Sequence, residues 1–117
     1  MSGQAGLLTW LAGLLLLTGS LHTAAQETHL ELGKAIAFDR NKGNCLSCHM
    51  IEGGELPGNS GPPLLMMQAR FPDREVLRAQ IYDAAERNPM TVMPPYGRHR
   101  ILTSEELDLV VDFIHSL

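Results

Sequence analysis

Apolar side chains recur at helical spacing in three stretches of the chain, residues 28–40, 72–87 and 103–117. The last stretch has the most regular pattern. Thr103 and Glu106 stand three positions apart at its start, which is the spacing of a capping box at a helix N-terminus. These stretches predict three main helices.

Local signals indicate where the other two helices begin and end. Thr28, with Glu31 three positions later, predicts that the first helix begins at Thr28. The second helix is expected to end before Pro89, because proline disfavours helix at the residue before it. The segments 51–65 and 89–102 are rich in glycine and proline and are predicted to be loops. No segment has the alternation of a strand, so the sequence predicts an all-α fold.

The first 25 residues contain no Asp, Glu, Lys or Arg. An apolar run, Leu7 to Leu17, is followed by small residues that end in Thr23-Ala24-Ala25, a pattern typical of a secretory signal peptide. The run is shorter than the roughly 20 apolar residues of a spanning helix. We therefore expect a signal peptide over 1–25, cleaved after Ala25, and an exported, periplasmic domain over 26–117 without a membrane span. Because Lys and Arg are absent before the run, an uncleaved anchor and a buried helix remain alternatives.

The net charge of the chain limits the classes of partner that it is expected to bind. A formal net charge of -4 gives no basic face for nucleic acid. It weakly favours a partner with a positive or neutral surface. No Ser/His/Asp set and no paired carboxylates stand out, so we expect no catalytic residues in this chain.

Cys45, Cys48 and His49 form the sequence C-x-x-C-H, the attachment motif of c-type haem. Two thiols at this spacing bond to the two vinyl groups of one porphyrin, and the histidine supplies the proximal iron ligand. A zinc site would need four ligands, and the chain has no third cysteine. A thioredoxin-type pair would sit in a βαβ unit. A disulfide in a haem-free helical module is the remaining alternative, and it would close a very small loop.

The second axial ligand of such an iron is expected to be a methionine. The methionines of the expected domain are Met50, Met66, Met67, Met90 and Met93. Met50 adjoins His49 and cannot reach the other face of a haem, whereas Met66 and Met67 are expected to fill gaps in the core. Met93 precedes two prolines that stiffen the backbone, so we predict Met93 as the ligand, with Met90 as the alternative.

Together these residues resemble the class I cytochrome c fold, in which three main helices and Gly/Pro-rich loops enclose a covalent haem. That fold combines a helix leading into C-x-x-C-H, a G-P-x-L turn and a methionine loop before a C-terminal helix. The resemblance implies that Pro62 gives its carbonyl to His49. It also implies that the first and last helices pack against each other, through Leu32, Ala35 and Ile36 on the first.

A narrower resemblance is to the SoxX family, the small monohaem subunit of the SoxAX cytochrome. It is carried by GNCLSCH, GNSGPPL, TVMPPYG and ILTSEELDLVVDFI, over roughly residues 33–114. Tyr96 stands where family members often have phenylalanine. Because C-x-x-C-H and G-P-x-L occur in many cytochromes, the more discriminating part is TVMPPYG and the helix after it.

The SoxX resemblance implies a role in thiosulfate oxidation. The chain would be the electron-transfer subunit of a heterodimeric L-cysteine S-thiosulfotransferase, with the transferase chemistry on a larger SoxA-like subunit. Thiosulfate would be coupled to a cysteine of a SoxYZ-like carrier, and the electrons would leave through the His49/Met93 haem to a soluble cytochrome. A free-standing cytochrome c that shuttles electrons is the alternative. His99 is interpreted as a surface loop residue.

Overall fold

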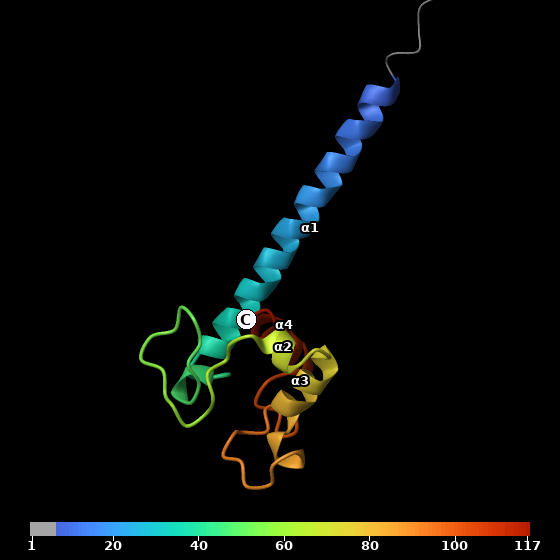
Figure 1. The fold of residues 1–117 in the computed structure, drawn as a ribbon. Coiled ribbons are helices and arrows are strands. Elements are labelled where there is room, and N and C mark those ends of the chain that lie inside the picture. The colour runs from blue at the N-terminus through green and yellow to red at the C-terminus, as the bar shows by residue number, and fades with distance from the viewer. Residues whose placement is uncertain (1–6) are drawn as a thin grey trace, which may run out of the picture.

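The computed structural model describes residues 7–117, with side chains from residue 23 onward (Figure 1). Its helices are α1 (Leu7–Phe38), α2 (Met67–Arg70), α3 (Arg74–Tyr82) and α4 (Ser104–His115), with 3₁₀ turns η1 (Cys45–Ser47) and η2 (Ala84–Glu86). No strand occurs within residues 7–117. The predicted all-α, class I cytochrome c-like fold is thus confirmed, with the short α2 as an addition.

Helix α1 begins well before the predicted start at Thr28, so that prediction is wrong. The helix passes through Thr28, whose hydroxyl donates back to the carbonyl of Ala24 at 3.0 Å instead of capping a helix start. The reason lies in the preceding sequence, which contains no proline between Leu7 and Thr28 to stop the helix. Residues 1–6 of the predicted signal peptide lie outside the described part, as do the side chains of residues 7–22. The cleavage after Ala25 therefore stays a prediction.

Among residues 23–117, no helix is long and apolar enough to cross a bilayer.

The second predicted helix is interrupted near its C-terminal end. Helix α3 ends at Tyr82, and η2 follows after Asp83, whose backbone is extended at φ -153°. Asp83 is only 2% exposed. Its carboxylate accepts from the backbone N–H of Ala85 at 3.1 Å and from Arg98 at 2.9 Å. The buried carboxylate therefore ends one helix, begins the next turn, and binds the loop that precedes α4.

Helix α4 begins as the sequence predicted. The hydroxyl of Thr103 accepts from the N–H of Glu106 at 3.1 Å, and the carboxylate of Glu106 accepts from the N–H of Thr103 at 3.0 Å. The predicted capping box is confirmed. Glu106 is also paired with Lys42, which follows α1, so the cap connects α4 to the end of α1.

Helices α1 and α4 cross at close range through a glycine. A Cβ added to Gly33 would lie 2.1 Å from the carbonyl oxygen of Leu109, so no larger residue fits there. Ala37 is fully buried at the same crossing, and Ile36 packs against the core. Leu32 is 52% exposed and Ala35 is exposed as well, so two of the three expected contact residues are wrong. The packing face lies one position further along the helix because glycine and alanine allow the closer approach.

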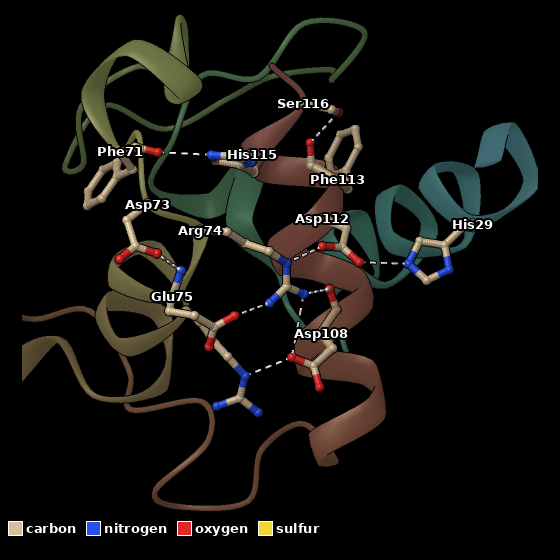
Figure 2. A network of polar contacts seen from close by, with 11 residues as sticks. His29, Phe71, Asp73, Arg74, Glu75, Asp108, Asp112, Phe113, His115 and Ser116 are labelled. Atoms are coloured by element: carbon tan, nitrogen blue, oxygen red, sulfur yellow. Dashed lines mark hydrogen bonds and ion pairs between the residues drawn. The ribbon is translucent and has the colours of Figure 1, made fainter.

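A polar network on another face connects three helices (Figure 2). Asp112 of α4 accepts from Arg74 of α3 at 2.5 Å and contacts Nε2 of His29 on α1 at 2.7 Å. Partial burial by itself would raise the pKa of Asp112, but the hydrogen bonds from Arg74 and His29 lower it overall. A carboxylate whose pKa is lower in the folded than in the unfolded state stabilises the fold at pH values above its unfolded-state pKa. That contribution is lost as the pH falls through the folded-state pKa.

Candidate functional site

A cavity of about 600 Å³ with a mostly apolar lining lies between the loops and the inner faces of α3 and α4. Its apolar wall includes Leu64, Leu77, Ile81, Leu102, Val110 and Ile114. A volume of this size, with an apolar lining and a few polar groups, is typical of a cofactor pocket.

Cys45, Cys48 and His49 all line this cavity. They follow α1 through a tight connection in which the N–H of Gly43 donates to the carbonyl of Ile36 at 3.1 Å. Asn44 then takes a left-handed conformation at φ 48° and starts η1. Within the motif the N–H of His49 donates to the carbonyl of Cys45 at 2.9 Å. The turn therefore presents both thiols and the imidazole to one space.

The two thiols differ in environment. Burial raises the pKa of the Cys45 thiol to about 11, so it is a neutral thiol at pH 7. Hydrogen bonds from Ser60 and Ser47 lower the pKa of Cys48. A neutral thiol is a poor metal ligand, because the thiolate is the form that binds metals. Among the described side chains no group of three or more His, Cys, Asp or Glu is placed to hold a metal ion.

The imidazole of His49 is fixed by the turn that the sequence singled out. Its Nδ1 lies 2.7 Å from the carbonyl oxygen of Pro62. A carbonyl can only accept, so Nδ1 carries the proton and Nε2 keeps a free lone pair. A histidine that binds a metal through one ring nitrogen is usually oriented in this way, by a hydrogen bond from its other ring nitrogen to an oxygen. The structure thus brings together His49 and Pro62 as the resemblance implied.

Gly61 lies flat against the same ring. A Cβ at this position would come within 2.4 Å of Cε1 and 2.6 Å of Nδ1 of His49. The turn itself is fixed by the N–H of Gly61, which donates to the carbonyl of Cys48 at 2.8 Å. A Cβ at position 61 would therefore force the ring or the turn to shift.

We therefore expect Gly61→Ala to lower the stability of the holoprotein by about 1–3 kcal/mol, the usual cost of overpacking. It should also shift the reduction potential, because the ring or its partner Pro62 must move. Gly53→Ala is the matched control, since Gly53 has φ +77° and only the end of Lys34 nearby. That variant should lose stability through backbone strain and keep its potential. Thermal unfolding and a redox titration measure both effects, and an unchanged potential in Gly61→Ala would contradict the assignment.

The two methionines proposed as iron ligands differ in burial and in their position relative to the cavity. Met93 lines the cavity and is partly buried against the core. Its N–H donates to the hydroxyl of Thr91 at 3.2 Å, which fixes the local loop. Met90 is 88% exposed and does not line the cavity. Of the two loop methionines, only Met93 is placed to offer sulfur to this space.

Met67 is the second methionine on the cavity wall, and it is buried. Its sulfur already accepts from the guanidinium of Arg70 at 3.3 Å. Its expected role in the core is consistent with this burial, whereas Met66 is 73% exposed and does not fill a gap in the core. Met66 stands just before α2 in a left-handed conformation at φ 51°.

Tyr96 belongs to the site although sequence reasoning gave it no role. It is buried on the cavity wall, and its hydroxyl donates to the carbonyl of Gly43 at 2.5 Å. Burial raises its pKa to about 12. The contact joins the methionine loop to the loop before Cys45. The only available signal was the presence of an aromatic residue next to Met93, Pro94 and Pro95.

These residues fit a covalent haem c. Two thiols, an imidazole with a free Nε2 and one uncommitted thioether face an apolar cavity. Cys45 and Cys48 would hold the porphyrin, and His49 and Met93 would be its axial ligands. A haem bound there supplies reversible one-electron exchange at its iron, while the protein sets its orientation and surroundings.

Comparison with known proteins agrees with this chemistry. An "Uncharacterized lipoprotein" of Aquifex aeolicus (strain VF5) is 32% identical over 75 residues, which are 63% of this chain and 36% of that protein. The chain thus spans little more than a third of that relative. The cytochrome c family matches residues 30–117, from the last part of α1 to the residues that follow α4. The chain therefore belongs to the cytochrome c family and is a haem c electron-transfer protein.

Proposed function

We propose that the protein carries one haem c on Cys45 and Cys48, ligated by His49 and Met93, and serves as the electron-transfer subunit of a SoxAX-like complex. The observation that carries the haem assignment is the meeting of these four residues in one cavity. Thiosulfate would be coupled to a carrier cysteine on the larger SoxA-like subunit. This chain would take up the electrons and pass them to a soluble cytochrome.

The segments that carry the SoxX resemblance lie around the cavity. GNSGPPL forms the turn that touches His49, TVMPPYG carries Met93 and Tyr96, and ILTSEELDLVVDFI includes α4. These segments cover residues 58–64, 91–97 and 101–114, and each contributes residues to the wall of the same cavity. Such convergence supports the resemblance as a whole, and the sulfur-oxidation role rests on it.

A partner surface is supported by the side chains of the methionine loop. Met90 and Val92 are 88% and 81% exposed, and Ile101 is 41% exposed. Exposed apolar side chains next to a cofactor cavity are typical of a docking site. From residue 87 to residue 104 the basic residues are Arg87, Arg98, His99 and Arg100, and there is no Asp or Glu.

The local charge at this surface is opposite to the net charge of the chain. Arg98 is paired with Asp83, whereas Arg87 and Arg100 have no ion pair among the described residues. The net charge of -4 favoured a positive or neutral partner, but contact is governed by the charges next to the interface. We therefore propose that the SoxA-like subunit presents an apolar patch with acidic groups around it.

Export to the periplasm is part of the same proposal. The relative from Aquifex aeolicus is called a lipoprotein, which supports an exported location for this chain as well. Cleavage after Ala25 would fall inside α1 and leave residues 26–38 of that helix. This remaining segment keeps both Gly33 at the crossing and His29 against Asp112. The domain would thus keep its packing after removal of residues 1–25.

Purification of the tagged protein from its native source tests the proposal. We expect a larger haem protein to co-purify at low salt and to dissociate as salt rises. Arg100→Glu should weaken this association several-fold more than Lys34→Glu, which changes the net charge equally but lies on α1, outside the methionine loop. Elution as a small monomer at low salt, with a haem that thiosulfate never reduces in reconstitution, would support the free-standing shuttle instead.

A further inference from the structure

Arg70, the last residue of α2, is one of three cations on the cavity wall, with Arg40 and Lys42. No Asp or Glu lines the cavity. Lys42 is paired with Glu106, but Arg70 makes no ion pair within the described residues. Its guanidinium is used for two other contacts, and both lie close to the groups expected to ligate the iron.

The first contact fixes the turn beside His49. One terminal nitrogen of Arg70 donates to the carbonyl of Pro63 at 2.8 Å. The preceding carbonyl, that of Pro62, accepts from Nδ1 of His49 at 2.7 Å. Pro62 and Pro63 have no N–H groups, so the backbone donors of the turn are those of Gly61 and Leu64 on either side, which donate to the carbonyls of Cys48 and Met50. Arg70 therefore supplies a donor that this Pro-Pro turn lacks.

The second contact of Arg70 is with the thioether of Met67, which lines the same cavity as Met93 and could compete with it as an iron ligand. The same nitrogen of Arg70 donates to Sδ of Met67 at 3.3 Å. Met67 is 2% exposed and lines the cavity together with Met93. A sulfur that accepts from a guanidinium is held in one orientation and shares its lone pair. Met93, by contrast, has no recorded hydrogen bond to its sulfur among the described residues.

We propose that Arg70 is a positioning residue for both axial ligands. It holds Pro63 so that Pro62 keeps its bond to His49, and it restrains the Met67 sulfur so that Met93 is the thioether available to iron. This proposal rests on the haem ligation given under the proposed function. Arg70 touches neither ligand, so its effect passes through the Pro62-Pro63 turn and through Met67.

Arg70→Met tests the proposal, with Arg40→Met as the matched control. Both variants remove one cavity cation, but Arg40 makes no contact with Pro63 or Met67. Both side chains are exposed, so folding should persist. Proton NMR of the reduced haem protein reports on each ligand separately. The Nδ1–H of His49 reports on its hydrogen bond by exchange, and an axial methionine shows methyl protons shifted strongly upfield by the haem ring.

In Arg70→Met we expect the His49 Nδ1–H to exchange at least about tenfold faster, the size expected for a weakened bond to an ordered carbonyl. A second upfield methionine methyl signal should appear and should vanish in Arg70→Met/Met67→Leu. Arg70→Lys keeps a donor and should restore slow exchange in part. Arg40→Met should match the wild type in both signals.

The proposal is overturned if Arg70→Met and Arg40→Met give the same exchange rate and the same single methyl signal. A wild-type protein without an upfield methyl signal is a different result. It would refute ligation by methionine and the Met67 part of the proposal. The effect on His49 would still be judged by the exchange rates of the two variants.

Discussion

Replacement of Cys45 and Cys48 by alanine is expected to give a chain without covalent haem that does not fold cooperatively. The two thiols are the only cysteines of the protein, so no other residue can form the thioether bonds. Without the cofactor the cavity of about 600 Å³ is left unfilled. At roughly 24 cal/mol per Å³, an empty enclosed cavity of this size would cost on the order of 10 kcal/mol, and water entering this partly open cavity lowers that upper value. That cost is comparable to the whole stability of a small domain. Circular dichroism during thermal unfolding, together with the mass of the intact protein, measures the result.

The two single cysteine variants and a serine variant in the same motif serve as controls for this experiment. Cys45→Ala and Cys48→Ala should each keep at most one thioether bond and lose part of the holoprotein. Ser47→Ala leaves both thiols in place and should retain normal haem content, because Ser47 is exposed and forms no thioether bond itself. Its hydroxyl donates to the carbonyl of Asn44 and lies 3.7 Å from Sγ of Cys48, so the variant also tests whether this contact matters for attachment. A double cysteine variant that unfolds cooperatively with unchanged stability would show that the fold does not depend on a bound cofactor.

Met93→Ala is expected to remove the axial sulfur while leaving the haem attached. The sulfur-to-iron charge-transfer band of the oxidised protein should disappear, and the reduction potential should fall, because a thioether ligand raises the potential. Met93 lines the cavity and is held by its loop, and no other loop methionine is placed to replace it. Absorption spectra of the oxidised protein and a redox titration measure both changes.

Two other methionines serve as controls for this variant. Met90→Ala should leave the band and the potential unchanged, because Met90 is 88% exposed and does not line the cavity. Met67→Leu should keep the band and cost less than about 1.5 kcal/mol of stability, as expected for a swap of similar volume. A band that survives in Met93→Ala and is lost in either control would assign the ligand to that residue instead.

The attachment motif could be found from the sequence because its residues are adjacent and their spacing is set by the cofactor. Cys45, Cys48 and His49 lie within one turn, so no tertiary information was needed to group them. Pro62 was different. It came from a family resemblance, and only the structure places its carbonyl 2.7 Å from His49.

The first helix shows what hydrophobic periodicity misses. Leu32 is strongly apolar and was expected at the crossing with α4, yet it is half exposed. Gly33 is nearly neutral on any hydrophobicity scale, but it decides the crossing because the helices approach too closely for a side chain. The start of the helix was misplaced for a related reason. Thr28 fits a capping pattern, but a helix already present before it leaves no free N–H groups to cap.

Other contacts in the site join residues that are far apart in the sequence. Tyr96 bonds the carbonyl of Gly43 across 53 positions. Met90 and Met93 stand three positions apart in one loop, so the sequence alone could rank them only by their neighbours. Burial separates them, because one side chain faces the cavity and the other faces solvent.

The central claim is that this chain holds a covalent haem on Cys45 and Cys48. Trypsin cuts after Lys42 and Arg70, and no Lys or Arg lies between them, so one peptide of residues 43–70 contains both cysteines and His49. Mass spectrometry of that peptide from the protein purified from its native source tests the claim directly. We predict the mass of the peptide plus one haem. A peptide with two free thiols, or one lighter by two hydrogens through a disulfide, would contradict the account.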